Sequence, residues 1–166
     1  ESNVEEQSSS SYSTLISENL INLFNYRIKR ERESAYLYKA MSLWLDHKGY
    51  FNAAKLWAKY YQEELNHAEW SVDFLLSLNI RPITPEIEMQ PNEFESLGEI
   101  IRKTLEHEIV VTKECQELAL ECNKESNILG YTVAHKYVQE QVEELNKANN
   151  LVDLLEVYGE DKLNLA

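Results

Sequence analysis

Four glutamates and one histidine are the residues of this sequence whose types and spacing could carry metal chemistry. Apolar residues recur at gaps of three and four in four long segments, and each segment has one glutamate on its apolar stripe. The four are Glu31, Glu64, Glu108 and Glu144. His67 follows Glu64 by three residues, so the two side chains share one helix face. Carboxylate oxygens with one imidazole suit iron or manganese better than magnesium or a thiol-bound metal.

The four glutamates are expected at one depth of the molecule. Each lies within about two residues of the middle of its segment, and at about 1.5 Å per residue their heights differ by roughly 3 Å. We expect no lysine or arginine in this layer, because the basic residues fall off the apolar stripes. Buried carboxylates repel one another, so either some are protonated or cations enter. Two divalent ions would neutralise four carboxylates, and the pattern therefore favours a two-metal site.

Four long helices must position these side chains. The expected helices cover residues 14–46, 49–78, 93–122 and 126–158. Asn92, with Glu95 three residues later, is expected to cap the third helix, and Ser126 or Asn127 the fourth. The segment Asn79–Asn92 contains three prolines and is too long for a simple turn. Two helical hairpins joined by one long crossover predict an all-α, ferritin-like four-helix bundle.

Composition limits the partners and the location. The chain has 16 lysines and arginines against 29 aspartates and glutamates, a net charge of −13, which disfavours nucleic acid and anionic membranes and favours cations. No run reaches the roughly 18 apolar residues of a membrane span. Cys115 and Cys122 are too far apart along one helix for a disulfide, so we expect reduced thiols and a cytoplasmic protein. An organelle lumen, after removal of a transit peptide, is the alternative.

The domain organisation follows from the same patterns. Residues 1–13 are polar, rich in serine and aperiodic, and they are expected to form a flexible arm. Residues 14–158 form the bundle, and residues 159–166 form a C-terminal tail.

Three stretches resemble non-haem ferritins of the bacterial and archaeal type. They are ERESAYLYKAMSLW at 31–44, QEELNH at 62–67 and QEQVEEL at 139–145. The resemblance covers about residues 14–158, in the family's order and spacing. It implies a protein that oxidises Fe(II) with O₂ and stores the ferric mineral inside a hollow homo-oligomer, a 24-subunit cage if the family pattern holds.

The resemblance also implies a ferroxidase centre with two irons. Glu31, Glu64 and His67 would hold the first iron. Glu64 would bridge to a second iron, held by Glu108 and Glu144. All five are thus implied to be both metal ligands and catalytic residues.

Five further residues match positions beside that centre. Tyr38 matches a neighbouring tyrosine, and Gln141 matches a glutamine beside the centre; both are counted with the catalytic residues, and Gln141 also with the metal ligands. Glu63, Glu140 and Glu143 match a third, weaker iron site seen in some bacterial ferritins. Helical spacing permits this site, because Glu140 and Glu143 share a face. Solvated surface glutamates are the alternative for these three.

The remaining histidines, and one difference from the bacterioferritin pattern, indicate which ferritin-like proteins this sequence does not resemble. His47, His107 and His135 have no carboxylate partners at metal-binding spacing and are expected at the surface or in packing roles. Bacterioferritins and rubrerythrins usually carry Glu-x-x-His on both the second and the fourth helix, whereas the fourth segment here has Gln141 three residues before Glu144 and no histidine three residues after it. This argues against those relatives and against a haem-binding subunit.

Three functions remain open from the sequence. Iron storage with ferroxidase activity predicts a large hollow particle that retains far more iron than its sites bind. A di-iron or di-manganese redox enzyme without storage predicts a small oligomer and stoichiometric metal. A helical structural module, with its glutamates protonated or hydrated, predicts no dependence on metal.

Overall fold

The computed structural model describes residues 15–165, with side chains described up to residue 161. This part of the chain forms four helices and no strand. The helices are α2 (Glu18–His47), α3 (Phe51–Ser77), α4 (Leu97–Lys124) and α5 (Ile128–Leu165). The predicted all-α bundle of four long helices is confirmed. The arm expected at residues 1–13 lies outside the described residues.

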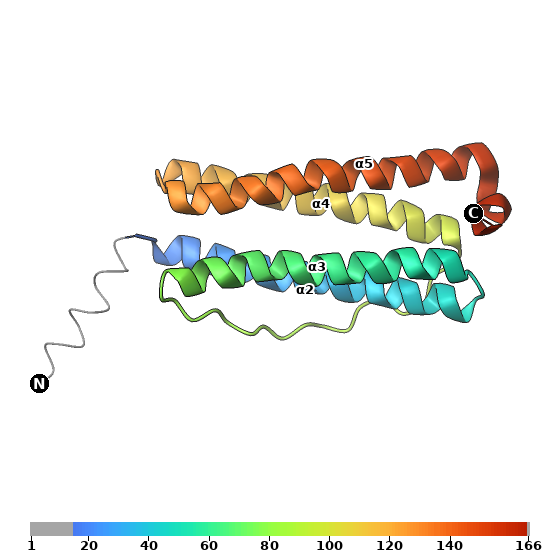
Figure 1. Ribbon diagram of the computed structural model, residues 1–166, viewed down its shortest axis with the longest axis horizontal. Helices are drawn as coiled ribbons and strands as arrows, with labels where there is room; N and C mark the ends of the chain where they lie inside the picture. Colours follow the sequence, from blue (N-terminus) through green and yellow to red (C-terminus); the bar gives the residue numbers. More distant parts are fainter. Residues whose placement is uncertain (1–14, 166) are drawn as a thin grey trace, which may run out of the picture.

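The helices form two antiparallel hairpins, α2 with α3 and α4 with α5, stacked on one another (Figure 1). The connection from α3 to α4 runs back along the whole length of the first hairpin (Figure 1). It is tied to α2 where the Ile83 backbone N–H donates a hydrogen bond to Asn25 Oδ1 at 2.9 Å. The single long crossover predicted from the prolines is therefore confirmed, and it returns the chain so that α4 runs in the same direction as α3 (Figure 1).

Helix α4 begins later than its sequence suggested. Its N-cap is Ser96, whose hydroxyl accepts a hydrogen bond from the Glu99 N–H, while Glu99 Oε2 accepts one from the Glu95 N–H. The predicted cap at Asn92 is wrong, because that side chain donates backward to the Gln90 carbonyl and the backbone stays non-helical. The start of α5 matches one of the two expected caps, since Asn127 Oδ1 accepts a hydrogen bond from the Gly130 N–H.

Helix α5 contains a break near its end. Gly159 has a φ of 72° and a ψ of 170°, outside the helical region, and helical residues continue beyond it to Leu165. After the break, the Glu160 carboxylate accepts a hydrogen bond from the Gly98 N–H at the start of α4. A Cβ at Gly98 would lie 2.7 Å from Glu160 Oε1, so a larger residue there would displace the Glu160 carboxylate. The boundary between bundle and tail at residue 158 stays a prediction.

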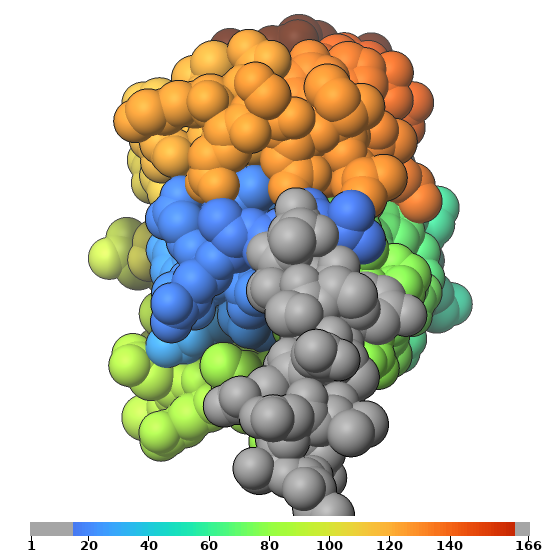
Figure 2. Space-filling model, turned by 90° about the vertical axis from the view of Figure 1, so that its left-hand side faces the viewer, coloured from blue at the N-terminus to red at the C-terminus, as the bar shows by residue number. Residues whose placement is uncertain are grey.

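One end of the bundle is closed by the turn between α4 and α5, which lies against the beginning of α2 (Figure 2). Asn127 Nδ2 donates a hydrogen bond to the Leu15 carbonyl at 2.8 Å, and Asn19 Nδ2 donates to Glu125 Oε2 at 2.9 Å. These bonds fix the two hairpins relative to one another along the bundle axis.

Two apolar clusters fill the ends of the bundle interior. One includes Phe24 and Leu75, and the other includes Met41 and Trp57. The layer between them is polar, and it contains Glu31 from the middle of α2. Cys115 and Cys122 are buried and unbridged. None of the described helices is long and apolar enough to cross a membrane.

Candidate metal centre

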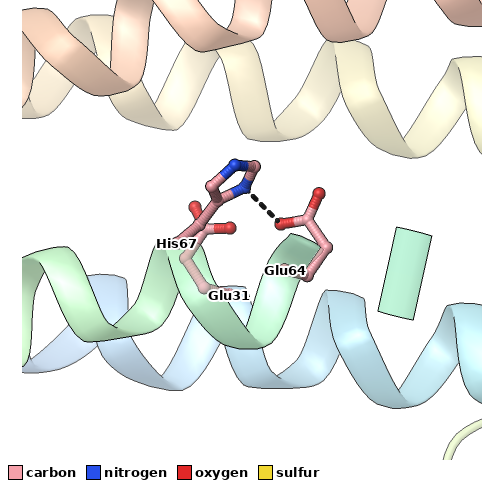
Figure 3. A group of neighbouring side chains, drawn as sticks. All are labelled: Glu31, Glu64 and His67. Atoms are coloured by element: carbon pink, nitrogen blue, oxygen red, sulfur yellow. Dashed lines mark hydrogen bonds and ion pairs between the residues drawn. The ribbon is translucent and has the colours of Figure 1, made fainter. Parts of the chain in front are cut away.

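The polar layer contains two groups of potential metal ligands that share one carboxylate. Ligand atoms of Glu31, Glu64 and His67 all lie within 4.8 Å of one another, and so do those of Glu64, Glu108 and Glu144. Figure 3 shows the first group extending from α2 and α3 into the space between the two hairpins, with one nitrogen of the His67 ring close to Glu64. All five residues are buried. Each of the four helices contributes one carboxylate, so the fold brings together side chains that are more than a hundred residues apart.

Glu108 is held in place by two neutral donors. The Tyr38 hydroxyl donates to Glu108 Oε1, and Gln141 Nε2 donates to Glu108 Oε2 at 2.9 Å. Gln141 also reaches Thr112 Oγ1 at 3.1 Å, which fixes the amide group itself. Tyr38 and Gln141 are both buried. They therefore orient the Glu108 carboxylate without adding a positive charge beside it.

His67 lies between the paired centre and a third helix. Its Nδ1 is 3.3 Å from Glu64 Oε2, and its Nε2 is 3.4 Å from Glu140 Oε1. The Tyr137 hydroxyl donates to the His67 backbone carbonyl, and the Trp70 ring centroid lies 4.7 Å from that of His67. These contacts fix the imidazole plane with one nitrogen directed at the carboxylate layer.

Burial and mutual repulsion favour the protonated form of three of the four carboxyls. Burial, followed by the charge of Glu31, raises the pKa of Glu64 well above its usual value. Burial also raises the pKa of Glu108. Burial and the nearby Glu108 raise the pKa of Glu144 to about 8. Part of the negative charge in the metal-free layer is thus removed by bound protons, one of the two solutions that the sequence left open.

The expectation that no basic residue reaches the layer is wrong. Arg27 is only 2% exposed, and its Nε lies 3.1 Å from Glu31 Oε1. Burial acts to raise the pKa of Glu31, but the guanidinium charge outweighs it, and the pKa lies below its ordinary value. Arg27 lies one turn before Glu31, off the narrow apolar stripe but on an adjoining face, and its long side chain extends to the carboxylate. The Arg–Glu spacing of four residues is the sequence signal that could have revealed it.

A second cation approaches the layer from its solvent side. Lys147 Nζ lies 3.5 Å from Glu144 Oε1 and 3.9 Å from Glu63 Oε2. The lysine side chain is 45% exposed, in contrast to the buried arginine. A cavity of about 10 Å³, lined among others by Glu108, Glu144 and Lys147, lies beside the second group. It has room for about one water-sized molecule.

The three residues predicted for a third iron site lie at the edge of the layer. Glu63 and Glu140 are partly buried, and Glu143 is exposed. Glu140 contacts His67, and Glu63 lies near Lys147 and 3.8 Å from Lys59. Neither of the two ligand groups found among the described residues includes any of these three. Their role as metal ligands stays a prediction.

The remaining histidines lie outside the carboxylate groups. His107 Nε2 is 2.7 Å from Ser34 Oγ, and its ring packs edge-on against Tyr38. Burial lowers the pKa of His107 to about 4, so the ring is neutral near pH 7. His47 is exposed, and His135 is exposed and stacked on Tyr131. His107 supports Tyr38, and through it the orientation of Glu108.

The donor set fits a pair of oxygen-preferring transition-metal ions. It consists of four carboxylates and one imidazole, and sharing of Glu64 allows one carboxylate to bridge two ions. Both carboxylate oxygens of Glu31 are buried, and neither accepts a hydrogen bond from the described N–H and hydroxyl donors. Arg27 compensates part of the Glu31 charge, and the unused lone pairs of both oxygens remain available to a bound cation. The geometry therefore suits a metal pair better than a structural polar layer.

Comparisons with known proteins agree with this architecture. The family model of the ferritin-like domain matches residues 21–157. The chain is 31% identical over 147 residues to a bacterial non-haem ferritin-like protein of Haemophilus influenzae, with 89% of each chain covered. It is 28% identical over 140 residues to a bacterial non-haem ferritin of Escherichia coli, with 84% of this chain and 85% of the relative covered.

A solved structure agrees as well. The open-pore ferritin of the hyperthermophilic archaeon Archaeoglobus fulgidus superposes with a TM-score of 0.86 at 35% identity. The match covers 90% of this chain and 92% of the archaeal one. The resemblance noted in the sequence motifs is confirmed over nearly the whole bundle. The chain therefore belongs to the ferritin family, as a non-haem member of the ferritin-like superfamily.

Proposed function

We propose that this protein stores iron and oxidises Fe(II) with O₂ at the paired carboxylate groups. The observation that carries the proposal is the shared, buried Glu64, which lies in both ligand groups and can bridge two ions. Glu31 and His67 complete the first position, and Glu108 and Glu144 complete the second. Two Fe(II) ions can then each give one electron to the same O₂ molecule. Two ferric ions and one hydrogen peroxide result when two protons are added.

The carboxylates contribute both to binding and to proton balance. Glu64 and Glu144 carry raised pKa values in the metal-free layer, so Fe(II) must displace their protons on binding. Once ionised, four carboxylates stabilise Fe(III) more than Fe(II), because the interaction grows with the charge of the ion. Tyr38 and Gln141 hold Glu108 at a fixed orientation and keep the second position assembled. Binding and oxidation are thus favoured by the same groups.

Storage, assembly and location extend the same proposal. The ferric product passes into the interior of a hollow homo-oligomer, which we propose to be a 24-subunit cage in the cytoplasm. Glu63, Glu140 and Glu143 form a weaker third iron site on the solvent side of the layer. Support comes from the acidic charge of −13 and from the contact of Glu140 with His67.

The decisive experiment is an aerobic Fe(II) titration with particle size measured in the same sample. We expect rapid oxidation of about two irons per chain and loss of that phase in Glu64→Ala. Glu69→Ala is the matched control, because Glu69 lies on the same helix but is exposed and paired only with Arg32 at 3.8 Å. Unchanged rapid oxidation in Glu64→Ala would refute the site.

Particle size and iron content separate the three functions. A large particle that retains far more than two irons per chain supports storage. A small oligomer with stoichiometric metal would replace storage by the redox-enzyme alternative. A protein whose stability and size do not respond to metal would be a structural module.

A further inference from the structure

Each of the two proposed metal positions has a positively charged side chain beside it, and the two side chains differ in solvent exposure. Arg27 is 2% exposed, and Glu31 is its only ion-pair partner among the described residues. Lys147, beside Glu144, has a side chain that is 45% exposed. The lysine can rotate into water when an ion approaches Glu144. The arginine is almost fully buried beside Glu31, and it also lines a surface pocket that contains Glu114 and Glu117.

A fixed positive charge must weaken cation binding at the nearer position. An ion bound by Glu31 lies within a few ångströms of the guanidinium, in a layer where water screens charges poorly. The same carboxylate is also already paired with Arg27, whose Nε lies 3.1 Å from Glu31 Oε1. The second position has two carboxylates of its own besides Glu64, and no enclosed cation contacts either of them among the described residues. The two positions are therefore electrostatically unequal.

We propose that Arg27 is a positioning residue that makes the Glu31–His67 position the weaker one, so that the Glu108–Glu144 position fills first. This inference rests on the proposed two-metal site. It assigns a role to a side chain that belongs to neither ligand group. The arginine holds Glu31 in place in the absence of metal and limits how tightly the first position retains an ion.

The test is an anaerobic titration with Co²⁺, followed by its visible absorption and by calorimetry. Wild type should bind in two distinguishable steps. Arg27→Gln should tighten the weaker step by about tenfold or more and change the stronger step much less. Arg27→Lys keeps the charge and should behave like wild type. Glu31→Gln should remove the weaker step and spare the stronger one, and adding Arg27→Gln to it should then have no effect.

Arg30→Gln is the matched control. It makes the same change in net charge on the same helix, but Arg30 pairs with Glu114 and Glu33, away from the ligands. Both binding steps should stay within about twofold of wild type. Arg27→Met fills the same space with an apolar side chain and must reproduce the tightening. Circular dichroism at the titration temperature confirms that each variant is folded.

The outcomes separate this inference from the proposed function. Two Co²⁺ steps in wild type with an unchanged weaker step in Arg27→Gln and Arg27→Met would overturn the inference alone. Equal tightening in Arg30→Gln, or loss of the stronger step in Glu31→Gln, would also overturn it. Failure of wild type to bind Co²⁺ would overturn both the inference and the two-metal site.

Discussion

Protons and one arginine share the task of compensating the buried carboxylates in the metal-free protein. The pKa values of Glu64, Glu108 and Glu144 are raised by burial, whereas Arg27 lowers that of Glu31. Glu31 therefore stays ionised while the other three bind protons more tightly than in the unfolded chain. Metal binding must displace those protons, so metal affinity should increase with pH.

The stability of the metal-free bundle should depend on pH in a direction set by these shifts. Glu144 has a folded pKa of about 8 against an ordinary value of 4.5. Its stabilising contribution is complete below the unfolded value and is lost as the pH rises through the folded one. We expect the melting temperature of metal-free protein to be lower at about pH 9 than at about pH 6. Thermal denaturation at the two pH values, after bound metal has been removed with a chelator, measures this difference.

Glu144→Gln should reduce this loss of stability, because it removes one of the repelling carboxylates. At the higher pH its metal-free form should melt above wild type, while its Co²⁺ affinity falls. Asp153→Asn is the control, since Asp153 is exposed on the same helix, lies outside the proposed ligands, and the change in charge is identical. A metal-free Glu144→Gln protein that melts below wild type at the higher pH would contradict the picture of crowded carboxylates.

Sequence patterns located the carboxylates but not the cations around them. The heptad stripe of the first helix passes through Phe24, Ile28 and Glu31, and it selects residues that point straight into the core. Arg27 lies beside that stripe, and only packing decides whether such a side chain extends into the layer or outward to water. Arg30 turns toward Glu33 and Glu114 instead. Apolar periodicity therefore does not predict which way a long side chain at the edge of a stripe will point.

At the scale of the elements, the apolar periodicity predicted where the four helices lie. Their exact ends depend on which polar side chains bind the backbone nearby. The position of Asn92, after Pro91 and three residues before Glu95, predicts it as the N-cap of the third helix. The backbone stays non-helical until Ser96, whose hydroxyl accepts from the Glu99 N–H, while the Glu99 carboxylate accepts from the N–H of Glu95, one residue before the cap. The Asn92 side chain donates a hydrogen bond to the Gln90 carbonyl and does not cap the helix.

Ser96→Ala should destabilise the bundle without altering the metal site. Loss of the cap leaves the Glu99 N–H without its acceptor and should lower the free energy of unfolding by about 1 kcal/mol. Urea denaturation measures the change, and rapid Fe(II) oxidation should be preserved. Thr132→Ala, at an exposed position inside α5, should change stability by less than about 0.5 kcal/mol. Equal effects of the two substitutions would mean that Ser96 does not act as a cap.

Across the whole molecule, charge and exposed apolar side chains serve different purposes. The net charge of −13 attracts cations from solution. The single chain also exposes large apolar side chains on its helices, among them Leu43, Leu76, Leu120 and Val142. Contacts between subunits would bury some of these side chains. An acidic surface that attracts Fe(II) and an apolar surface that buries itself between subunits together fit the proposed homo-oligomeric store.

Ionic strength should separate capture of Fe(II) from its oxidation. Screening shortens the reach of the acidic surface from about 10 Å at 0.1 M salt to about 3 Å at 1 M, whereas buried ligands are screened much less. Raising NaCl from roughly 0.05 to 0.5 M should therefore lower the oxidation rate several-fold at limiting Fe(II). The rate at saturating Fe(II) should change by less than about twofold over the same range. Stopped-flow absorbance measures both, and an equal salt effect on the two rates would mean that salt acts on the buried site and not on the approach of the ion.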